Sequence, residues 1–182
     1  MARQTLQEGP YLDAPIASPL AADVATTAVL MWNPLQFTKF YGDEARRSRI
    51  YVVEAGGLIT CAATGALTIS PSITTTNAAG TTLGASFAQT VPASAPAGPW
   101  FMKSVWTVTA IGAPGGNNAS MIGEGHFTSG GVAATASSGL QVSFGGTAAV
   151  FDQSVANAIA FTKTLSVAGS FTTHWCFGYW MN

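Results

Sequence analysis

The feature that most constrains the fold is the regular spacing of turn signals between short apolar segments. From residue 26 onward, clusters of Gly, Pro and Asn recur about every 8–15 residues, and no segment between them has the apolar period of an amphipathic helix. Some segments instead alternate with period two, as 140–144 does. About eight or nine strands with no intervening helix favour an all-β fold, an antiparallel β-sandwich that is jelly-roll-like, over an α/β fold. The pattern leaves strand order open.

The predicted strands are rich in β-branched and aromatic residues and end at Gly, Pro or Asn. They lie at 27–32, 49–54, 58–63, 66–74, 100–111, 121–128, 140–144, 158–167 and 171–180, while the state of 36–41 stays open. Gly56 and Gly57 are predicted to end one strand, and Pro71 indicates a bulge or an edge position. The strand at 100–111 places Trp100 and Trp106 on one face, which we expect to be buried.

Charged side chains are scarce. Only 15 of the 182 residues are Asp, Glu, Lys or Arg, where an average soluble domain would have about 45. After Ala55 the only ones are Lys103, Glu124, Asp152 and Lys163. An uncharged surface favours association with other chains. The net charge of −1 gives no reason to expect nucleic acid, which needs clustered Lys and Arg, and no apolar run is long enough to span a membrane.

Residues 1–25 differ from the β region at 26–182. Three prolines interrupt any helix, and apolar side chains recur at Tyr11, Leu12, Ile16 and Leu20. A disordered terminus is one interpretation; we prefer an extended arm that lies on a neighbouring subunit through these four residues. The segment has no apolar core typical of a signal peptide, so synthesis in a cytoplasm is expected.

Residue types that catalyse reactions or bind metals are few in this chain, so we expect that the protein is not an enzyme and has no cofactor and no metal site. His126 and His174 lie in predicted strands, and a strand histidine without a catalytic role is the simpler interpretation. His174 and Cys176 would share a strand face, but a zinc site needs two further ligands. Cys61 and Cys176 are expected to be buried free thiols, with a disulfide as the alternative.

The last strand carries a row of aromatic side chains. Trp175, Phe177 and Tyr179 alternate along it, so they share one face, while Trp180 lies on the other face. One face completes the core and the other is exposed or lies in a subunit interface. We expect these four residues to form the subunit interface, with a glycan-binding platform as the alternative.

Several segments resemble virion structural proteins of tailed bacteriophages. They are GTTLGAS at 80–86, QTVPA at 89–93, PW at 99–100, AIG at 110–112 and GEGHF at 123–127. The resemblance covers about residues 26–182. It implies a β-sandwich subunit on a capsid, spike or fibre, commonly trimeric.

The resulting hypothesis is a capsid decoration or cement protein on the virion surface. Its arm would bind the major capsid protein, and its β body would form a homotrimer. The alternative is a receptor-binding head-fibre or tail-tip protein that recognises host glycans through exposed loops at 74–80, 113–119 and 129–138.

Overall fold

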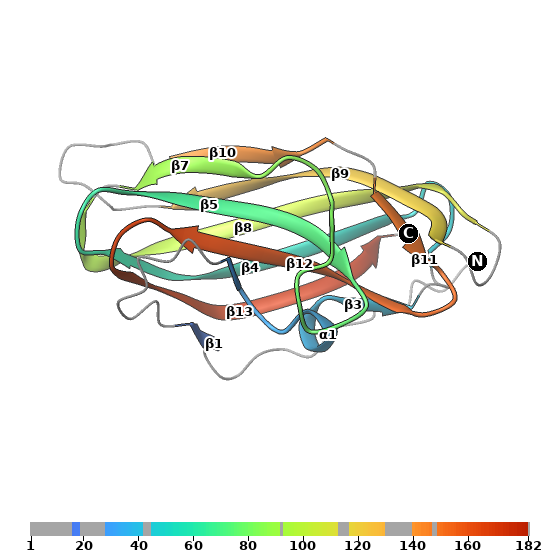
Figure 1. Ribbon diagram of the computed structural model, residues 1–182, viewed down its shortest axis with the longest axis horizontal. Helices are drawn as coiled ribbons and strands as arrows, with labels where there is room; N and C mark the ends of the chain where they lie inside the picture. Colours follow the sequence, from blue (N-terminus) through green and yellow to red (C-terminus); the bar gives the residue numbers. More distant parts are fainter. Residues whose placement is uncertain are drawn as a thin grey trace.

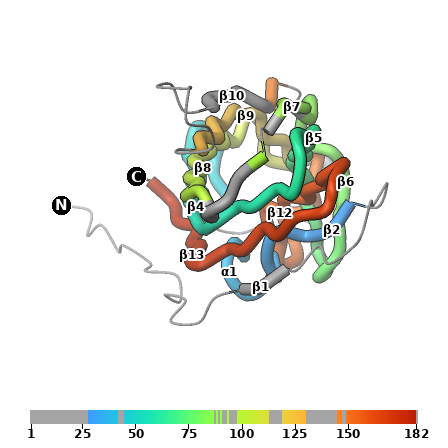
Figure 2. The backbone as a smooth tube through the Cα atoms, turned by 90° about the vertical axis from the view of Figure 1, so that its left-hand side faces the viewer, coloured from blue at the N-terminus to red at the C-terminus, as the bar shows by residue number. Residues whose placement is uncertain are grey.

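Two antiparallel sheets pack face to face in the computed structural model (Figure 1). It describes residues 16–18, 28–41, 45–91, 93–112, 117–129, 140–146 and 149–181. The predicted all-β sandwich is confirmed. The view along the sandwich in Figure 2 shows the two layers, with α1 (Pro34–Phe37) lying along one open side.

The larger sheet has the order β1–β13–β4–β8–β9–β10, and β11 also pairs with β9. Its strands are β1 (Ile16–Ser18), β4 (Ile50–Cys61), β8 (Ser94–Ala110), β9 (Asn117–Ser129), β10 (Leu140–Gly145), β11 (Ala149–Asp152) and β13 (Gly169–Met181).

The smaller sheet has the order β2–β12–β5–β6, with β3 on β12 and β7 on β5. Its strands are β2 (Val29–Leu30), β3 (Lys39–Tyr41), β5 (Gly65–Thr74), β6 (Thr81–Thr82), β7 (Phe87–Val91) and β12 (Ala156–Leu165).

A two-stranded ribbon wraps from one sheet into the other. β4 pairs with β13 in the larger sheet, and β5 pairs with β12 in the smaller one. The chain crosses between the sheets at 62–64 and again at 166–168, and two hydrogen bonds join these turns: Ala62 N–H to the Ala168 carbonyl and Ser166 N–H to the Ala66 carbonyl. Because this ribbon wraps from one sheet into the other, we describe the sandwich as jelly-roll-like.

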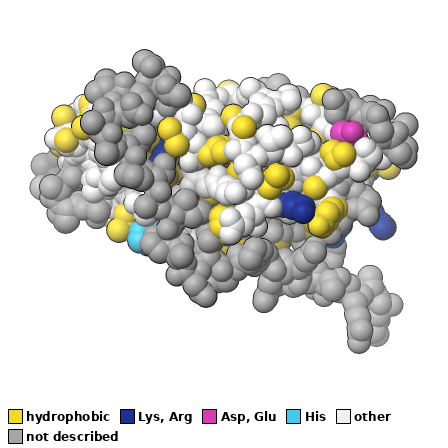
Figure 3. Space-filling model, turned by 60° about the horizontal axis from the view of Figure 1, so that its bottom comes forward, with side chains coloured by type: hydrophobic (Ala, Val, Ile, Leu, Met, Phe, Trp, Pro, Cys, Tyr) yellow, Lys and Arg dark blue, Asp and Glu magenta, His cyan; other side chains and the backbone are white. Residues whose placement is uncertain are grey.

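The core lies between the two sheets and is mostly aromatic and aliphatic. Trp100 and Trp106 are both buried in it, as predicted. Cys61 and Cys176 are buried free thiols, also as predicted, and burial raises the pKa of both. Charged side chains are sparse among the hydrophobic and small polar ones on the face in Figure 3.

The prediction that Gly56 and Gly57 end a strand is wrong, because β4 runs through both to Cys61. A Cβ atom at Gly56 would lie 2.7 Å from the Trp175 indole, and one at Gly57 would overlap the Thr172 carbonyl oxygen. The two glycines therefore mark the close approach of β13 to β4 rather than a turn.

The stretch at 36–41, whose state the sequence left open, contributes the end of α1 and all of β3. Pro34 begins the helix, a position where its missing N–H costs nothing. Thr38 anchors the helix end to β12, since its hydroxyl donates to the Ile159 carbonyl at 2.6 Å and accepts from Trp32 Nε1 at 3.2 Å. Of the strand predicted at 27–32, only Val29 and Leu30 form a strand among the described residues, and this strand is β2.

The edge of the larger sheet carries part of the predicted arm. In β1, Ile16 pairs with Thr173 of β13, so this piece of the segment lies on the chain's own sheet. Tyr11, Leu12 and Leu20 lie outside the described residues.

Candidate association surface and pocket

The outer face of the larger sheet gathers aromatic side chains from two strands. On β13, Trp175, Phe177 and Tyr179 point outward and are half-buried, as their alternation predicts. The register sets Trp175 opposite Gly56 of β4, and Gly56 opposite Phe101 of β8. Four rings therefore lie close together on one face, which we call the aromatic face.

The rings of the aromatic face are in mutual contact. The Trp175 and Phe177 centroids lie 5.5 Å apart at an interplanar angle of 24°, and those of Phe177 and Tyr179 lie 5.9 Å apart at 28°. Phe101 joins them, with its centroid 5.8 Å from that of Trp175. Because Gly56 has no side chain, the indole of Trp175 lies directly over the β4 backbone. The result is a continuous apolar surface of overlapping rings.

One ion pair lies beside these rings. Lys103 Nζ is 2.7 Å from Glu54 Oε1, and the Tyr179 hydroxyl donates to the same oxygen at 3.3 Å. The hydrogen bond to Glu54 raises the pKa of Lys103, and burial together with the Glu54 charge raises the pKa of Tyr179. The two opposite charges cancel locally, so the centre of this face has no net charge.

Trp180 does not belong to this face, so the part of the predicted interface that includes it needs correction. Its side chain is only 8% exposed and lies between the sheets. Its ring centroid is 4.9 Å from that of Tyr51 and 5.3 Å from that of Phe40. Alternation along β13 sends Trp180 inward and its neighbour Tyr179 outward. The other three predicted interface residues remain candidates.

The expectation that His174 and Cys176 share a face is wrong. A register shift between Thr173 and Trp175 leaves His174 exposed in a bulge, whereas Cys176 is buried in the core. His126 is exposed on the outer face of β9, opposite Lys103. Within the described parts of the chain, His, Cys, Asp and Glu side chains form no group of three that would hold a metal ion.

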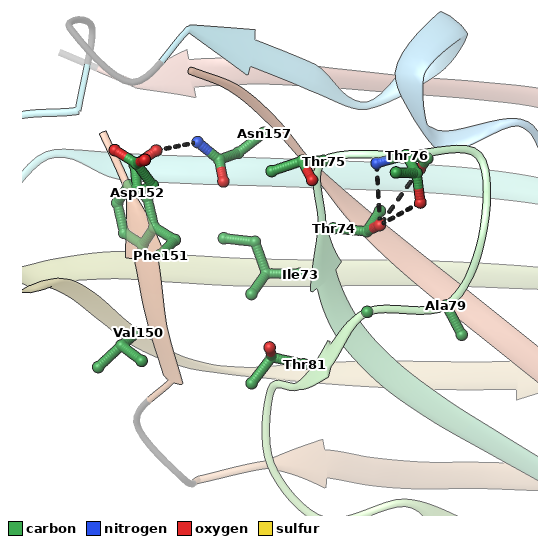
Figure 4. A pocket seen from close by; sticks show the side chains of 11 residues that line it. Ile73, Thr74, Thr75, Thr76, Ala79, Thr81, Val150, Phe151, Asp152 and Asn157 are labelled. Atoms are coloured by element: carbon green, nitrogen blue, oxygen red, sulfur yellow. Dashed lines mark hydrogen bonds between the residues drawn. The ribbon is translucent and has the colours of Figure 1, made fainter. Parts of the chain in front are cut away.

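A pocket lies at one end of the sandwich, between the loop at 75–80 and β11 (Figure 4). It has a volume of about 310 Å³. Its lining comes from the end of β5, the loop, β6, β11 and the start of β12, and comprises Ile73, Thr74, Thr75, Thr76, Ala79, Gly80, Thr81, Val150, Phe151, Asp152 and Asn157. Apolar side chains and hydroxyl groups both face this space.

Local hydrogen bonds fix the two polar ends of the pocket. The Thr74 hydroxyl accepts from the Thr76 N–H at 3.1 Å, and the Ser72 hydroxyl accepts from the Gly80 N–H at 3.3 Å. On the other side, Asp152 Oδ1 accepts from the Ser154 N–H at 2.8 Å and from its hydroxyl at 2.6 Å. These bonds lower the pKa of Asp152, so its carboxylate is charged at neutral pH.

Sequence reasoning found the aromatic row and the exposed loop at 75–80 but missed the pocket. Residues of β5 and β11 are distant in sequence and meet only because the sheets wrap, so no local spacing signals it. The Glu54–Lys103 pair was missed for the same reason, since it depends on the register of β4 with β8.

Comparison with models of protein families, with curated proteins and with solved structures finds no match to this chain. In the described residues, no helix has the length and apolar character needed to cross a membrane.

Proposed function

We propose that the protein is a structural subunit of a tailed-phage virion, a capsid decoration or cement protein whose copies associate through the aromatic face. The observation that supports this most is the neutral apolar centre of that face. The β-sandwich body and the scarcity of charge agree with it, as does the resemblance of about residues 26–182 to virion structural proteins.

The aromatic face offers the kind of area that binds another protein. Beside its rings lies a further exposed apolar side chain, Leu58, which is two residues from Gly56 on the same face of β4 and is 38% exposed. Phe101 is 40% exposed. Aromatic residues dominate the energetics of interfaces, and contiguous apolar patches of this kind mark interaction sites.

The partner that we assign to this face is another copy of the chain, in a homotrimer. Because Glu54 and Lys103 neutralise each other at 2.7 Å, three copies of this centre can meet around a threefold axis without net electrostatic repulsion. A strongly charged partner would gain no electrostatic attraction from this uncharged centre.

Replacing Trp175 and Phe177 together by Ser is expected to dissociate the oligomer. The change removes two contacting rings from the centre of the proposed interface, where truncation of a hot-spot residue costs about 2 kcal/mol or more, which corresponds to roughly 30-fold weaker association. Analytical ultracentrifugation over a concentration series measures this change.

The matched control is Val155→Ser, which also removes an exposed apolar side chain (43% exposed) but from a turn away from the aromatic face. This variant should associate like the wild type. A monomeric wild type, or equal association of all three proteins, would contradict the assignment of this face.

Deleting residues 1–15 is expected to reduce binding to capsids while β1 and the sandwich remain. The apolar side chains at Tyr11 and Leu12 are proposed to contact the major capsid protein, and multivalent attachment by a trimer multiplies weak single contacts. Occupancy on purified particles, counted by quantitative gel densitometry, measures this. Full occupancy of the shortened protein, with its trimer intact, would remove the arm from the proposed mechanism.

The alternative, a receptor-binding head-fibre or tail-tip protein, uses the same β body. It predicts binding to host glycans and no effect of the protein on capsid stability. Thermal disruption of particles with and without the protein separates the two functions.

A further inference from the structure

The pocket between the loop at 75–80 and β11 combines three features that suit one class of ligand. It has an apolar floor, a wall of hydroxyl groups and two fixed hydrogen-bond acceptors. Its volume of about 310 Å³ is at the lower end of the range for small-molecule sites, so it accommodates one small ligand.

The first fixed acceptor is the side-chain amide oxygen of Asn157, a residue that is only 1% exposed. Its Nδ2 donates to the Asp152 carbonyl at 2.7 Å and to the Val155 carbonyl at 2.9 Å. Both partners are acceptors, so the nitrogen must be the atom that faces them and Oδ1 must point the other way. In Figure 4 this oxygen points away from Asp152 into the pocket.

The second acceptor is the carboxylate of Asp152. Ser154 holds one of its oxygens with two hydrogen bonds, which sets the orientation of the group at the pocket rim. Because this carboxylate is charged, an anionic ligand would be repelled. The two acceptors lie on the same side of the pocket (Figure 4) and call for a ligand with several neutral donors.

The remaining walls of the pocket are apolar or carry hydroxyl groups, which suits the parts of such a ligand that do not face the two acceptors. Ile73 and Phe151 form a buried apolar floor, and the exposed residues Thr75, Thr76 and Thr81 place hydroxyl groups around it. The loop is tied down through Thr74 and Gly80, and a Cβ atom at Gly80 would overlap the Ile73 carbonyl oxygen. The pocket is therefore preformed.

We infer that this pocket binds a neutral saccharide unit, with its hydroxyl groups donating to Asn157 Oδ1 and the Asp152 carboxylate and its C–H face resting on Ile73 and Phe151. A sugar ring has this combination of a hydroxyl edge and an apolar face. The site goes beyond assembly through the aromatic face and does not depend on it, because the two lie on different elements.

The test is titration of the full chain with neutral hexoses and N-acetylhexosamines, followed by amide NMR shifts. Saturable shifts are expected at Thr75, Thr76, Thr81 and the Asn157 side-chain amide, with dissociation constants on the order of millimolar, as befits a single sugar. Glucuronic acid, whose carboxylate would face that of Asp152, should bind at least several-fold more weakly.

Two matched variants test the location. Thr81→Trp fills the pocket from its own wall and should abolish the shifts, whereas Thr82→Trp, at the neighbouring exposed position of β6 but outside the lining, should bind like the wild type. Asp152→Asn retains a single acceptor oxygen and should weaken binding several-fold.

No saturable shift with any neutral sugar, or equal binding by Thr81→Trp and the wild type, would overturn the inference. Neither result would affect the association measured by ultracentrifugation, so the saccharide site and the assembly proposal can fail separately.

Discussion

Replacing Lys163 by Met should raise the free energy of unfolding below pH 7 and remove its rise above pH 7. Lys163 is fully buried between the sheets, where Nζ donates to the Phe171 carbonyl at 2.8 Å and lies 4.4 Å from the centroid of the Phe171 ring. Burial disfavours the charged ammonium and lowers the pKa of Lys163 to about 7.

The direction of the pH dependence follows from this lowered pKa. Above pH 7 the folded protein holds the neutral amine, while the unfolded chain binds the proton up to its ordinary pKa of 10.5. Stability therefore rises with pH across that interval by about 1.4 kcal/mol per unit, or about 2 kcal/mol between pH 7 and 8.5. Below pH 7 both states bind the proton and the destabilisation is fully present.

Met fills a similar volume without a charge, so the variant should unfold with little pH dependence over this range. It also leaves the Phe171 carbonyl without the lysine donor, which costs about 1–3 kcal/mol at any pH. The two stability curves should therefore converge or cross as pH rises. Urea unfolding at pH 6.0, 7.0 and 8.5 measures them, because this range lies below the ordinary thiol pKa of 9.0 that Cys61 and Cys176 have in the unfolded chain.

The control is Lys39→Met, which removes an exposed lysine from β3. This variant should keep the slope of the wild type. Parallel curves for the wild type and Lys163→Met would show that Lys163 is not the group responsible.

The pattern of strands was predictable because alternation and turn residues act locally. β10, β12 and β13 lie within a few residues of their predicted positions. In β12, Ile159, Phe161 and Leu165 recur at intervals that fit period two, and all three lie on the core face. The same period places Lys163 on that face. The sequence pattern therefore indicates that Lys163 is buried, although lysine side chains are usually exposed to solvent.

Contacts between distant segments were not predictable. Gly56 and Gly57 look like a turn, and only the neighbouring β13 shows why they lie inside a strand. The exposure of His174 depends on a bulge at the pairing of β13 with β4, which alternation along a single strand cannot signal. The pocket forms only because the sheets wrap, so the sequence gives no indication that its polar residues lie close together.

The second large effect is expected at Trp106 of β8, the strand around which the larger sheet is arranged. Its side chain is completely buried opposite Tyr51 of β4, and its Nε1 donates to the Ser104 hydroxyl at 2.9 Å. Trp106→Ala removes most of this contact and leaves a cavity, which should cost about 3–5 kcal/mol of unfolding free energy. Urea unfolding with an unchanged denaturant slope measures it.

Three further variants separate the packing of the indole from its hydrogen bond. Trp106→Phe keeps an aromatic ring but leaves the buried Ser104 hydroxyl without its donor, Ser104→Ala removes the acceptor, and the double variant removes both. The loss in the double variant should be smaller than the sum of the two single losses, because an unsatisfied hydroxyl costs more than a missing pair.

Strictly additive losses would mean that the hydrogen bond contributes nothing, and a loss below about 1 kcal/mol for Trp106→Ala would contradict its central place in the core. Since Trp106 faces inward, the folded fraction of each variant should still associate through the aromatic face, so stability and assembly can be altered independently.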